Sequence, residues 1–474
     1  MKRIILFLLI SLSLAGCKDQ LTEDEEFNQY VNEWIYQNMS MLYYWNTTLP
    51  EHKATTQDPS AYFVTLKNKD DRFSAIFDNY EEILNRLNGV NSSDVGFEFQ
   101  LYRESSANEN VIGIVLYVKP GTSAKTTGIK RGDIFRKING TQITTANYSN
   151  LMNYFYDATS SVNVTFSDYV DYVFYDKPAV SINKATNYQE NPVFLDTVYT
   201  IQSKKIGYLV YNFFTNDAGD GSLQYDLKLN NVFGRFKAQN INELVVDLRY
   251  NSGGMMSSAI RLGSMMVPNL TTSKVFTYTE YNQNYTDYFN SSEFKKDYPG
   301  VNPFTDNFAT TISTVAIQNV GNNIQRIYFI TGQNTASASE MVINGLKPYL
   351  PCILIGDTTV GKNVGSTLVH DEDNVNNQWA FMPIILKYFN KDHLSDFTQG
   401  FAPDYYLKDD YKHLLGDTNE ALLAKAITLI TGAQSSPARI QTSDSELYSQ
   451  PLYNKKERGT IVRKMAIDAY QKRK

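Results

Sequence analysis

Two polar residues, each in a loop that follows an apolar run, have the types and the spacing needed for nucleophilic catalysis. Ser337 follows the apolar run 328–330, and Glu340 comes three residues later, which is the spacing of a capping box. Ser337 is therefore expected at a helix N-terminus, where free N–H groups and the helix dipole stabilise negative charge. Lys362 lies 25 residues further on, in a Gly-rich loop after the apolar run 353–356. A strand, loop, helix and strand return the chain to one sheet edge, so the two side chains can meet.

A serine hydroxyl becomes a useful nucleophile only when a base takes its proton, and lysine is a base only in its neutral form. Burial in an apolar loop disfavours the ammonium ion and lowers the lysine pKa. Ser337 and Lys362 are thus candidates for a Ser–Lys pair that performs acyl transfer, with backbone N–H groups holding the oxyanion. Ser337 alone would be an ordinary N-cap serine. The second loop is what favours catalysis.

Four short motifs in a fixed order resemble those of the carboxyl-terminal processing proteases, the tail-specific serine peptidases of family S41. The motifs are D-x-R-x-N-x-G-G at 247–254, S-A-S-E at 337–340, T-x-G-K at 359–362 and G-x-x-P-D at 400–404. The resemblance spans roughly residues 92–432. It implies Ser337 as nucleophile and Lys362 as base. It further implies an oxyanion site made by backbone N–H groups of Ala338, Gly253 and Gly254.

Two positions depart from the pattern of that family. A glutamine four residues after the lysine commonly helps to orient the amine, and this chain has Ser366 there. A serine can accept the same hydrogen bond over a shorter reach, so Ser366 is expected in the catalytic group. Asn363 stands where glycine is usual. Two alternatives stay open: a catalytically impaired peptide-binding lipoprotein, and a Ser–Lys amidase or esterase.

Other motifs for chemistry are incomplete in this chain. The phosphate-binding pattern G-x-x-x-x-G-K-[ST] fails at Lys362 because asparagine follows. The S-x-x-K pattern at 181–184 and 292–295 lacks its K-T-G partner. The four histidines show no paired metal spacing. We therefore expect no metal and no cofactor, and a formal net charge of −6 gives no reason to expect nucleic acid as a partner.

The elements expected around the motifs indicate an α/β catalytic domain over residues 198–432. Apolar runs predict strands at 206–210, 244–248 and 327–330, and a helical pattern lies at 257–266. By family resemblance this domain has a ClpP- and crotonase-like spiral arrangement. Residues 180–205 show little periodicity and are predicted to form a connection.

Residues 92–180 are rich in β-type runs and resemble a PDZ domain. The runs lie at 95–99, 111–118 and 134–138, and turn residues separate them in the order found in protease PDZ domains. The resemblance implies that the loop at Gly96 and Phe97 offers backbone N–H groups to a peptide carboxylate. A PDZ domain adds an extended peptide to a sheet edge. A packing module that binds nothing is the alternative.

Residues 27–90 are predicted to form a helical N-terminal domain, because apolar residues recur at spacings of three and four over 27–45 and again over 62–84. Ahead of it, residues 18–26 form an acidic tether. Residues 1–17 combine two basic residues, an apolar run of 11 residues and the ending Leu-Ala-Gly-Cys. The apolar run is too short to span a bilayer and is typical of a signal peptide. The ending resembles a bacterial lipobox, which implies that Cys17 is the lipidated residue.

The sequence therefore predicts a multidomain α/β (α+β) protein of the bacterial cell envelope, held in the outer membrane as a lipoprotein through Cys17. Its expected partners are a protein or peptide substrate and, through the lipid, the membrane. Cys352, in an apolar run, is predicted to be a core residue and not a catalytic thiol. Residues 433–474 form a C-terminal tail to which no function is assigned.

Overall fold

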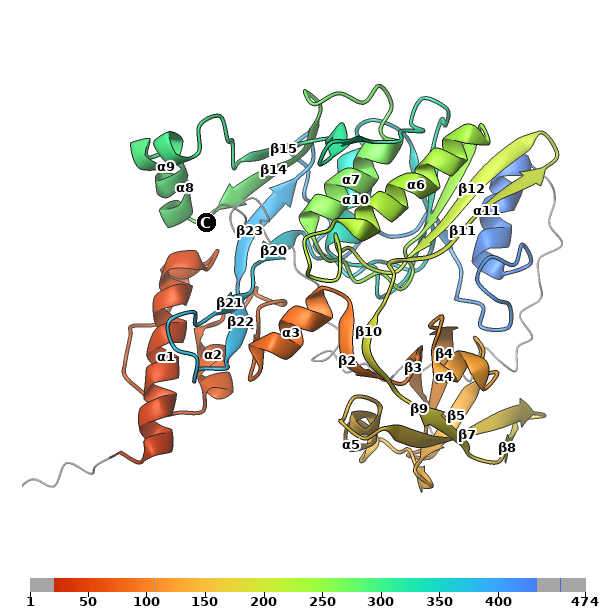
Figure 1. Cartoon of the computed structure of the whole chain (residues 1–474), viewed down its shortest axis with the longest axis horizontal. Coiled ribbons are helices and arrows are strands. Elements are labelled where there is room, and N and C mark those ends of the chain that lie inside the picture. The colour runs from red at the N-terminus through yellow and green to blue at the C-terminus, as the bar shows by residue number, and fades with distance from the viewer. Residues whose placement is uncertain (1–20, 106, 433–451, 453–474) are drawn as a thin grey trace, which may run out of the picture.

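The computed structural model describes residues 21–105, 107–432 and 452, so the predicted signal sequence, Cys17 and most of the predicted tail lie outside the described residues. The helices that begin the described chain lie at one end of the molecule and the large parallel sheet at the other (Figure 1). A separate β-rich unit lies below that sheet in the same view (Figure 1). Within the described ranges no helix has the length and apolarity to cross a membrane.

A six-stranded sheet forms the centre of the catalytic part. Its strands, in spatial order, are β11 (Val193–Ile201), β12 (Lys204–Tyr211), β13 (Glu243–Asp247), β18 (Ile327–Thr331), β19 (Cys352–Gly356) and β24 (Tyr405–Tyr406). All pairs are parallel except β11 with β12. The apolar runs predicted as strands are confirmed as β12, β13, β18 and β19. Parallel strands covered on both faces require such continuous apolar runs.

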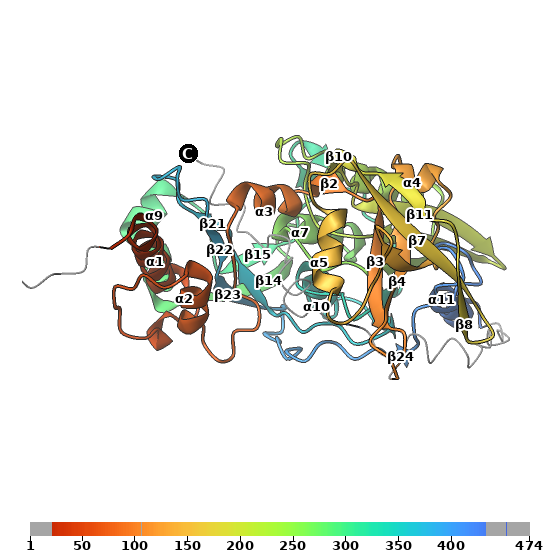
Figure 2. The same cartoon turned by 90° about the horizontal axis from the view of Figure 1, so that it is seen from below.

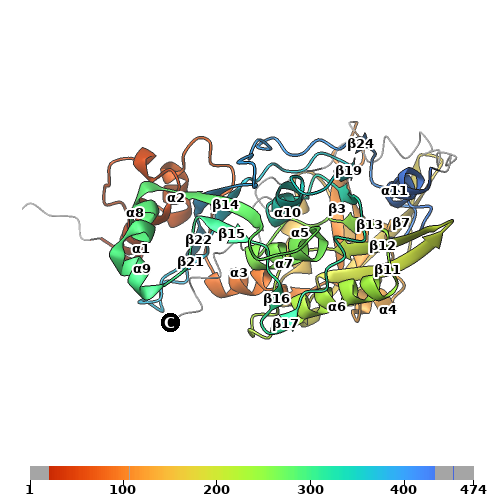
Figure 3. The ribbon, with the colours of Figure 1, turned by 90° about the horizontal axis from the view of Figure 1, so that it is seen from above.

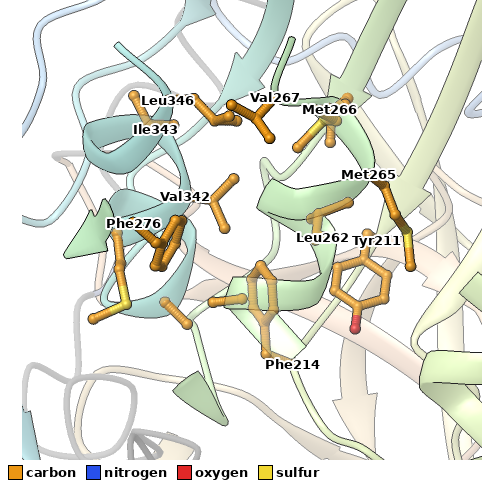
Figure 4. Close-up of a cluster of buried hydrophobic side chains, with 14 of the residues drawn as sticks. Tyr211, Phe214, Leu262, Met265, Met266, Val267, Phe276, Val342, Ile343 and Leu346 are labelled. Atoms are coloured by element: carbon orange, nitrogen blue, oxygen red, sulfur yellow. The ribbon is translucent and has the colours of Figure 1, made fainter. Parts of the chain in front are cut away.

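Helices cover both faces of this sheet. Packed on one face are α6 (Gln224–Ala238), α7 (Met256–Met266) and α10 (Ala338–Leu346), and on the other is α11 (Ala421–Thr431). Between α7 and α10, Leu262 and Met266 lie opposite Val342 and Leu346, all fully buried or nearly so (Figure 4). Burial of each such side chain stabilises the fold by about 1.5–3 kcal/mol, so α10 and its N-terminus are held firmly.

The β-rich unit is a second, mainly antiparallel sheet over residues 97–183. Its strands, seen from below in Figure 2, are β3 (Phe97–Arg103), β4 (Val111–Val118), β5 (Ile134–Ile138), β7 (Ser161–Val170) and β8 (Val173–Asp176), with β6 (Thr141–Gln142) and β9 (Val180–Asn183) paired to β5 and β7. It carries the short helices α4 (Ser123–Thr126) and α5 (Tyr148–Met152). Edge strand β3 has no strand partner beyond β4 among the described residues.

The predicted connection at 180–205 is wrong, because this segment is almost entirely strand. β9 pairs with β7, β10 (Ala185–Gln189) pairs with β2 (Val90–Asp94), and β11 pairs with β12. β9 and β10 pair with strands that precede them in the sequence, and β11 forms a hairpin with β12. Local apolar periodicity, on which the prediction rested, does not register pairing of this kind.

The N-terminal part is helical as predicted, with α1 (Glu23–Leu42), α2 (Pro59–Leu66) and α3 (Tyr80–Leu87). The tether predicted over 18–26 is wrong at residues 23–26, because these acidic residues form the first turn of α1. Viewed from above, α1 and α2 lie beside α8 (Gln283–Asn290) and strands β21 (Val369–His370) and β22 (Ala380–Met382) (Figure 3). The helical pattern extended over residues 73–77 is wrong. There the chain forms β1 (Ala75–Phe77), which pairs antiparallel with β22 (Ala380–Met382) of the catalytic part.

The remaining elements frame the loop that carries Lys362. A four-stranded sheet has the order β15 (Thr305–Asn307), β14 (Val275–Tyr281), β23 (Ile384–Phe389) and β20 (Val364–Ser366). Strand β22 also pairs with β21 (Val369–His370). A small hairpin and one further helix complete the chain at β16 (Thr311–Ile312), β17 (Val315–Ala316) and α9 (Ser292–Asp297). Two single 3₁₀ turns lie at Asn46–Thr48 and Asn153–Phe155.

Candidate active site

Ser337 lies where the chain turns from β18 into α10, and its backbone is strained. Its φ of 60° and ψ of −116° lie in a region of backbone conformation that residues other than glycine rarely adopt. Such conformations persist where surrounding structure over-determines them, and they concentrate at functional sites. Nucleophilic serines in other hydrolases also stand on a sharp strand-to-helix turn. The residue is fully buried and is the N-cap of α10, as its sequence context predicts.

One buried carboxylate joins the serine turn to the lysine loop. The Glu340 carboxylate accepts the N–H of Ser337 at 2.9 Å, of Gly361 at 2.7 Å and of Lys362 at 2.8 Å. It also accepts the Thr359 hydroxyl at 2.6 Å. Burial raises the pKa of Glu340, although these hydrogen bonds oppose the change. The sequence predicted only the contact to Ser337, because the other donors come from a loop distant in the chain.

Lys362 is fully buried, and within the described part of the chain its Nζ makes no hydrogen bond. The Phe73 ring centroid lies 5.5 Å from Nζ. Burial lowers the pKa of Lys362 from 10.5 to about 7, although the negative charges of Asp71 and Glu340 oppose the change. A large share of the amine is therefore neutral near pH 7, which is the state that a general base requires.

Ser366 ends β20 and is fully buried, and its Oγ too lacks a hydrogen-bond partner among the described residues. Ser366 and Lys362 therefore do not bond each other in this conformation, nor does Nζ bond the Ser337 hydroxyl. Catalytic hydrogen bonds are often loose in enzymes without substrate and tighten when substrate binds. A residue absent from the sequence prediction, Tyr388 on β23, donates its hydroxyl to the Lys362 carbonyl at 2.7 Å, and that hydroxyl lies 3.2 Å from the Ser337 carbonyl.

Residues 395–401, which lead into the motif at 400–404, contact the lysine loop, and the Phe401 N–H donates to the Thr359 hydroxyl at 2.7 Å. Gly361 has a φ of 85°, and a Cβ there would lie 2.4 Å from the Thr398 carbonyl oxygen, so only glycine fits this close approach. Asn363, which departs from the usual glycine, donates its side-chain amide to the Ser395 carbonyl at 2.8 Å. The departure therefore adds a tether to the loop and does not open it.

The residues predicted for the oxyanion site meet at the serine turn, but their N–H groups differ in availability. Ala338 is the first residue of α10, so its N–H has no acceptor within the helix. A Cβ on Gly253 would lie 3.0 Å from the Ala338 nitrogen, so the two segments are in contact. The Gly253 N–H already donates to the Asn251 side chain at 2.8 Å. Gly254 forms a β-bridge with Phe214 at the same turn.

A buried charge network lies behind the 247–254 motif. Arg249 contacts Asp247 at 2.7 Å, Glu420 at 2.8 Å and Asp409 at 2.7 Å. Arg131, from the β-rich unit, contacts the same Asp409 oxygen at 2.7 Å. Burial acts to raise the pKa of Asp409, but the two guanidinium groups outweigh it and hold that pKa low. The network links the β-rich unit to the catalytic sheet, and its members Asp409 and Glu420 belong to no motif recognised in the sequence.

The loop at Gly96 and Phe97, predicted to bind a peptide carboxylate, already contacts a carboxylate of the chain itself, that of Asp94. The Gly96 N–H donates to Asp94 at 2.7 Å, and Asp94 is paired with the buried Lys119 at 2.6 Å. Phe97 is the first residue of β3. Further along this edge strand, the Leu101 carbonyl accepts the N–H of Leu452 at 2.9 Å.

Other reactive side chains lie away from this site. Cys352 is at the start of β19, and burial raises the pKa of its thiol to about 12. A thiol with such a pKa stays protonated and unreactive. No group of three or more His, Cys, Asp or Glu side chains that could hold a metal ion occurs in the part of the chain described.

Comparison with known proteins places the chain in a family. The model of peptidase family S41 matches residues 205–407, and that of the peptidase S41 N-terminal domain matches residues 30–75, together more than half of the chain. No curated protein matches significantly. A structure described as an S41 protease from Bacteroides fragilis aligns with a TM-score of 0.68 at 24% identity, covering 85% of this chain and 98% of that one.

A photosystem II D1 C-terminal processing protease aligns with a TM-score of 0.49 at 16% identity, covering 86% of this chain and 99% of that one. The Bacteroides fragilis structure supports the mixed helix-and-sheet fold, and the two family models support the assignment. The chain belongs to peptidase family S41 and is a serine peptidase.

Proposed function

We propose that the protein is a serine endopeptidase in which Ser337 is the nucleophile and Lys362 the general base. The observation that carries the proposal is a lysine that is fully buried, has its pKa lowered to about 7 and shares one carboxylate, that of Glu340, with the serine turn. An S41 membership implies peptide bonds as the target.

The reaction follows from these positions. Ser337 Oγ attacks the peptide carbonyl carbon while Lys362 Nζ takes the hydroxyl proton, and the tetrahedral oxyanion is held by the N–H groups of Ala338 and Gly254. The C–N bond then breaks, and the amine product leaves with the proton from Nζ. Water, deprotonated by the same amine, hydrolyses the acyl-enzyme and restores Ser337.

We propose further that the substrate is an extended or tail-presenting polypeptide, and that the unit 97–183 acts as a PDZ domain that receives it along β3. The supporting observation is that the Leu101 carbonyl of this edge strand accepts a main-chain N–H from outside its sheet, at 2.9 Å. Strand addition uses such main-chain bonds and tolerates many side chains. An outer-membrane location through a lipid on Cys17 completes the proposal.

The test compares the chain lacking residues 1–17 with its Ser337→Ala and Lys362→Ala variants. Each is incubated with β-casein, and cleavage is followed by mass spectrometry. Cleavage by the parent alone would support the Ser–Lys endopeptidase. Cleavage by Lys362→Ala at the parent rate would refute the role of the lysine.

The same three proteins distinguish the two alternatives. A parent that is inert on several unfolded proteins and on small esters would favour a peptide-binding protein without activity. Hydrolysis of small esters or amides alone, lost in Ser337→Ala, would favour an amidase or esterase.

A further inference from the structure

Residues 67–74, between α2 and β1, contact the lysine loop although they lie far from it in the sequence. The Phe73 ring centroid lies 5.5 Å from Lys362 Nζ. This segment was predicted to be helical, and β1 instead pairs with β22 of the catalytic part. It thus belongs to the wall of the active site, although no catalytic motif of the sequence includes it.

The turn that presents Phe73 is built around a buried aspartate. Asp71 Oδ1 accepts the N–H groups of Phe73 at 2.9 Å and Ser74 at 2.8 Å. Its other oxygen accepts the Tyr43 hydroxyl at 2.7 Å. The Ser74 hydroxyl in turn accepts the Ile384 N–H at 2.8 Å. These bonds fix the turn that carries Phe73, and the bond between Ser74 and Ile384 joins this turn to the catalytic part.

Arg72 joins the same turn to the lysine loop and to the loop that contains Thr398. Arg72 donates to the Thr398 carbonyl at 2.7 Å and to the Val360 carbonyl at 3.0 Å. Its guanidinium carbon lies 4.8 Å from the centroid of the Phe73 ring, and Lys362 Nζ lies 5.5 Å from the same centroid.

We propose that Phe73 is a positioning residue for Lys362: the turn of Asp71 and the clamp of Arg72 hold its ring as the wall that keeps water from Nζ. The inference rests on the proposed Ser–Lys mechanism. A dry wall disfavours the ammonium form, and a charged amine could not serve as base.

The ionisable groups near Nζ do not account for this effect. Asp71 and Glu340 face it with negative charge, and both favour the charged amine. The Tyr388 hydroxyl, on β23, is bonded to the Lys362 backbone carbonyl. Burial raises its pKa far above its ordinary value, which keeps it neutral. Exclusion of water therefore has to outweigh two carboxylates, and Phe73 is the aromatic side chain placed against the amine.

The test replaces the ring and follows the pH dependence of kcat/KM on an unfolded protein substrate between pH 5.5 and 10. In Phe73→Ala we expect the lower apparent pKa to rise by at least about one pH unit, so that activity at pH 6 falls about tenfold while the high-pH plateau is kept. Phe73→Leu should stay near the parent. Phe77→Ala is the matched control, because Phe77 packs against the Ile83 and Leu87 cluster and not against the lysine.

A second readout does not need activity. In protein labelled with ¹³C-lysine, the Cε signal of Lys362, assigned by its loss in Lys362→Met, titrates with the pKa of the amine. A raised pKa in Phe73→Ala and an unchanged one in Phe77→Ala support the inference. An unchanged pKa in Phe73→Ala overturns it, even if the Ser–Lys mechanism stands. Conversely, full activity of Lys362→Ala would refute the mechanism alone, and the NMR titration would still decide on Phe73.

Discussion

Replacing Lys362 with methionine is expected to make the folded protein more stable at neutral pH. Burial lowers the pKa of this amine from 10.5 to about 7. Between these values the unfolded chain binds one more proton than the folded one, so the parent gains stability as pH rises through this window. At about 1.4 kcal/mol per pH unit, the cost of the buried amine is about 5 kcal/mol below pH 7 and disappears above pH 10.5. Methionine is unbranched and apolar, so it can fill the same space beside Phe73.

The assay is urea unfolding of the parent and of Lys362→Met at pH 7 and at pH 9.5. We expect the variant to be the more stable at pH 7, and the gap to narrow by about 3 kcal/mol at pH 9.5. The exposed Lys125→Met serves as control and should show no such change with pH. A gap that is the same at both pH values would refute the reasoning, because it would mean that the amine keeps its proton in the folded state.

Three further substitutions and one truncation test the site. In Glu340→Gln an amide replaces the shared acceptor, and the free energy of unfolding in urea should fall by about 3 kcal/mol, with little change in the exposed Glu372→Gln. Gly253→Ala would place a Cβ 2.7 Å from that of Ser337, so kcat should fall at least about a hundredfold with an unchanged circular dichroism spectrum; an active variant would contradict the contact. Arg131→Met leaves a buried carboxylate with one partner fewer and should cost about 3–5 kcal/mol in urea unfolding, unlike Arg103→Met on the more exposed pair. A chain ending at Gly432 lacks Leu452 and should bind apolar peptides along β3 more tightly by fluorescence anisotropy, whereas equal affinity would show that Leu452 does not compete.

The site residues are accessible from sequence where chemistry and local spacing coincide. Ser337 with Glu340 is a capping pattern within one turn, and Lys362 follows a short apolar strand, so the order of residues alone places both at loop ends. Tyr388 cannot be found in this way. Its hydroxyl contacts the carbonyls of Lys362 and Ser337, which lie 26 and 51 residues away in the chain, and nothing in its local spacing marks it.

The amino-acid sequence by itself determined four strands of the catalytic sheet, β12, β13, β18 and β19, and the helix that begins after Ser337, because apolar periodicity and turn chemistry act over a few residues. Only the tertiary structure decided that residues 75–77 leave the helical pattern to pair with β22, and that Glu340 joins the serine turn to the lysine loop. The low pKa of Lys362 is likewise a property that only the tertiary structure decides. A pKa depends on how much water and charge surround a group, and here segments from distant parts of the chain supply that environment.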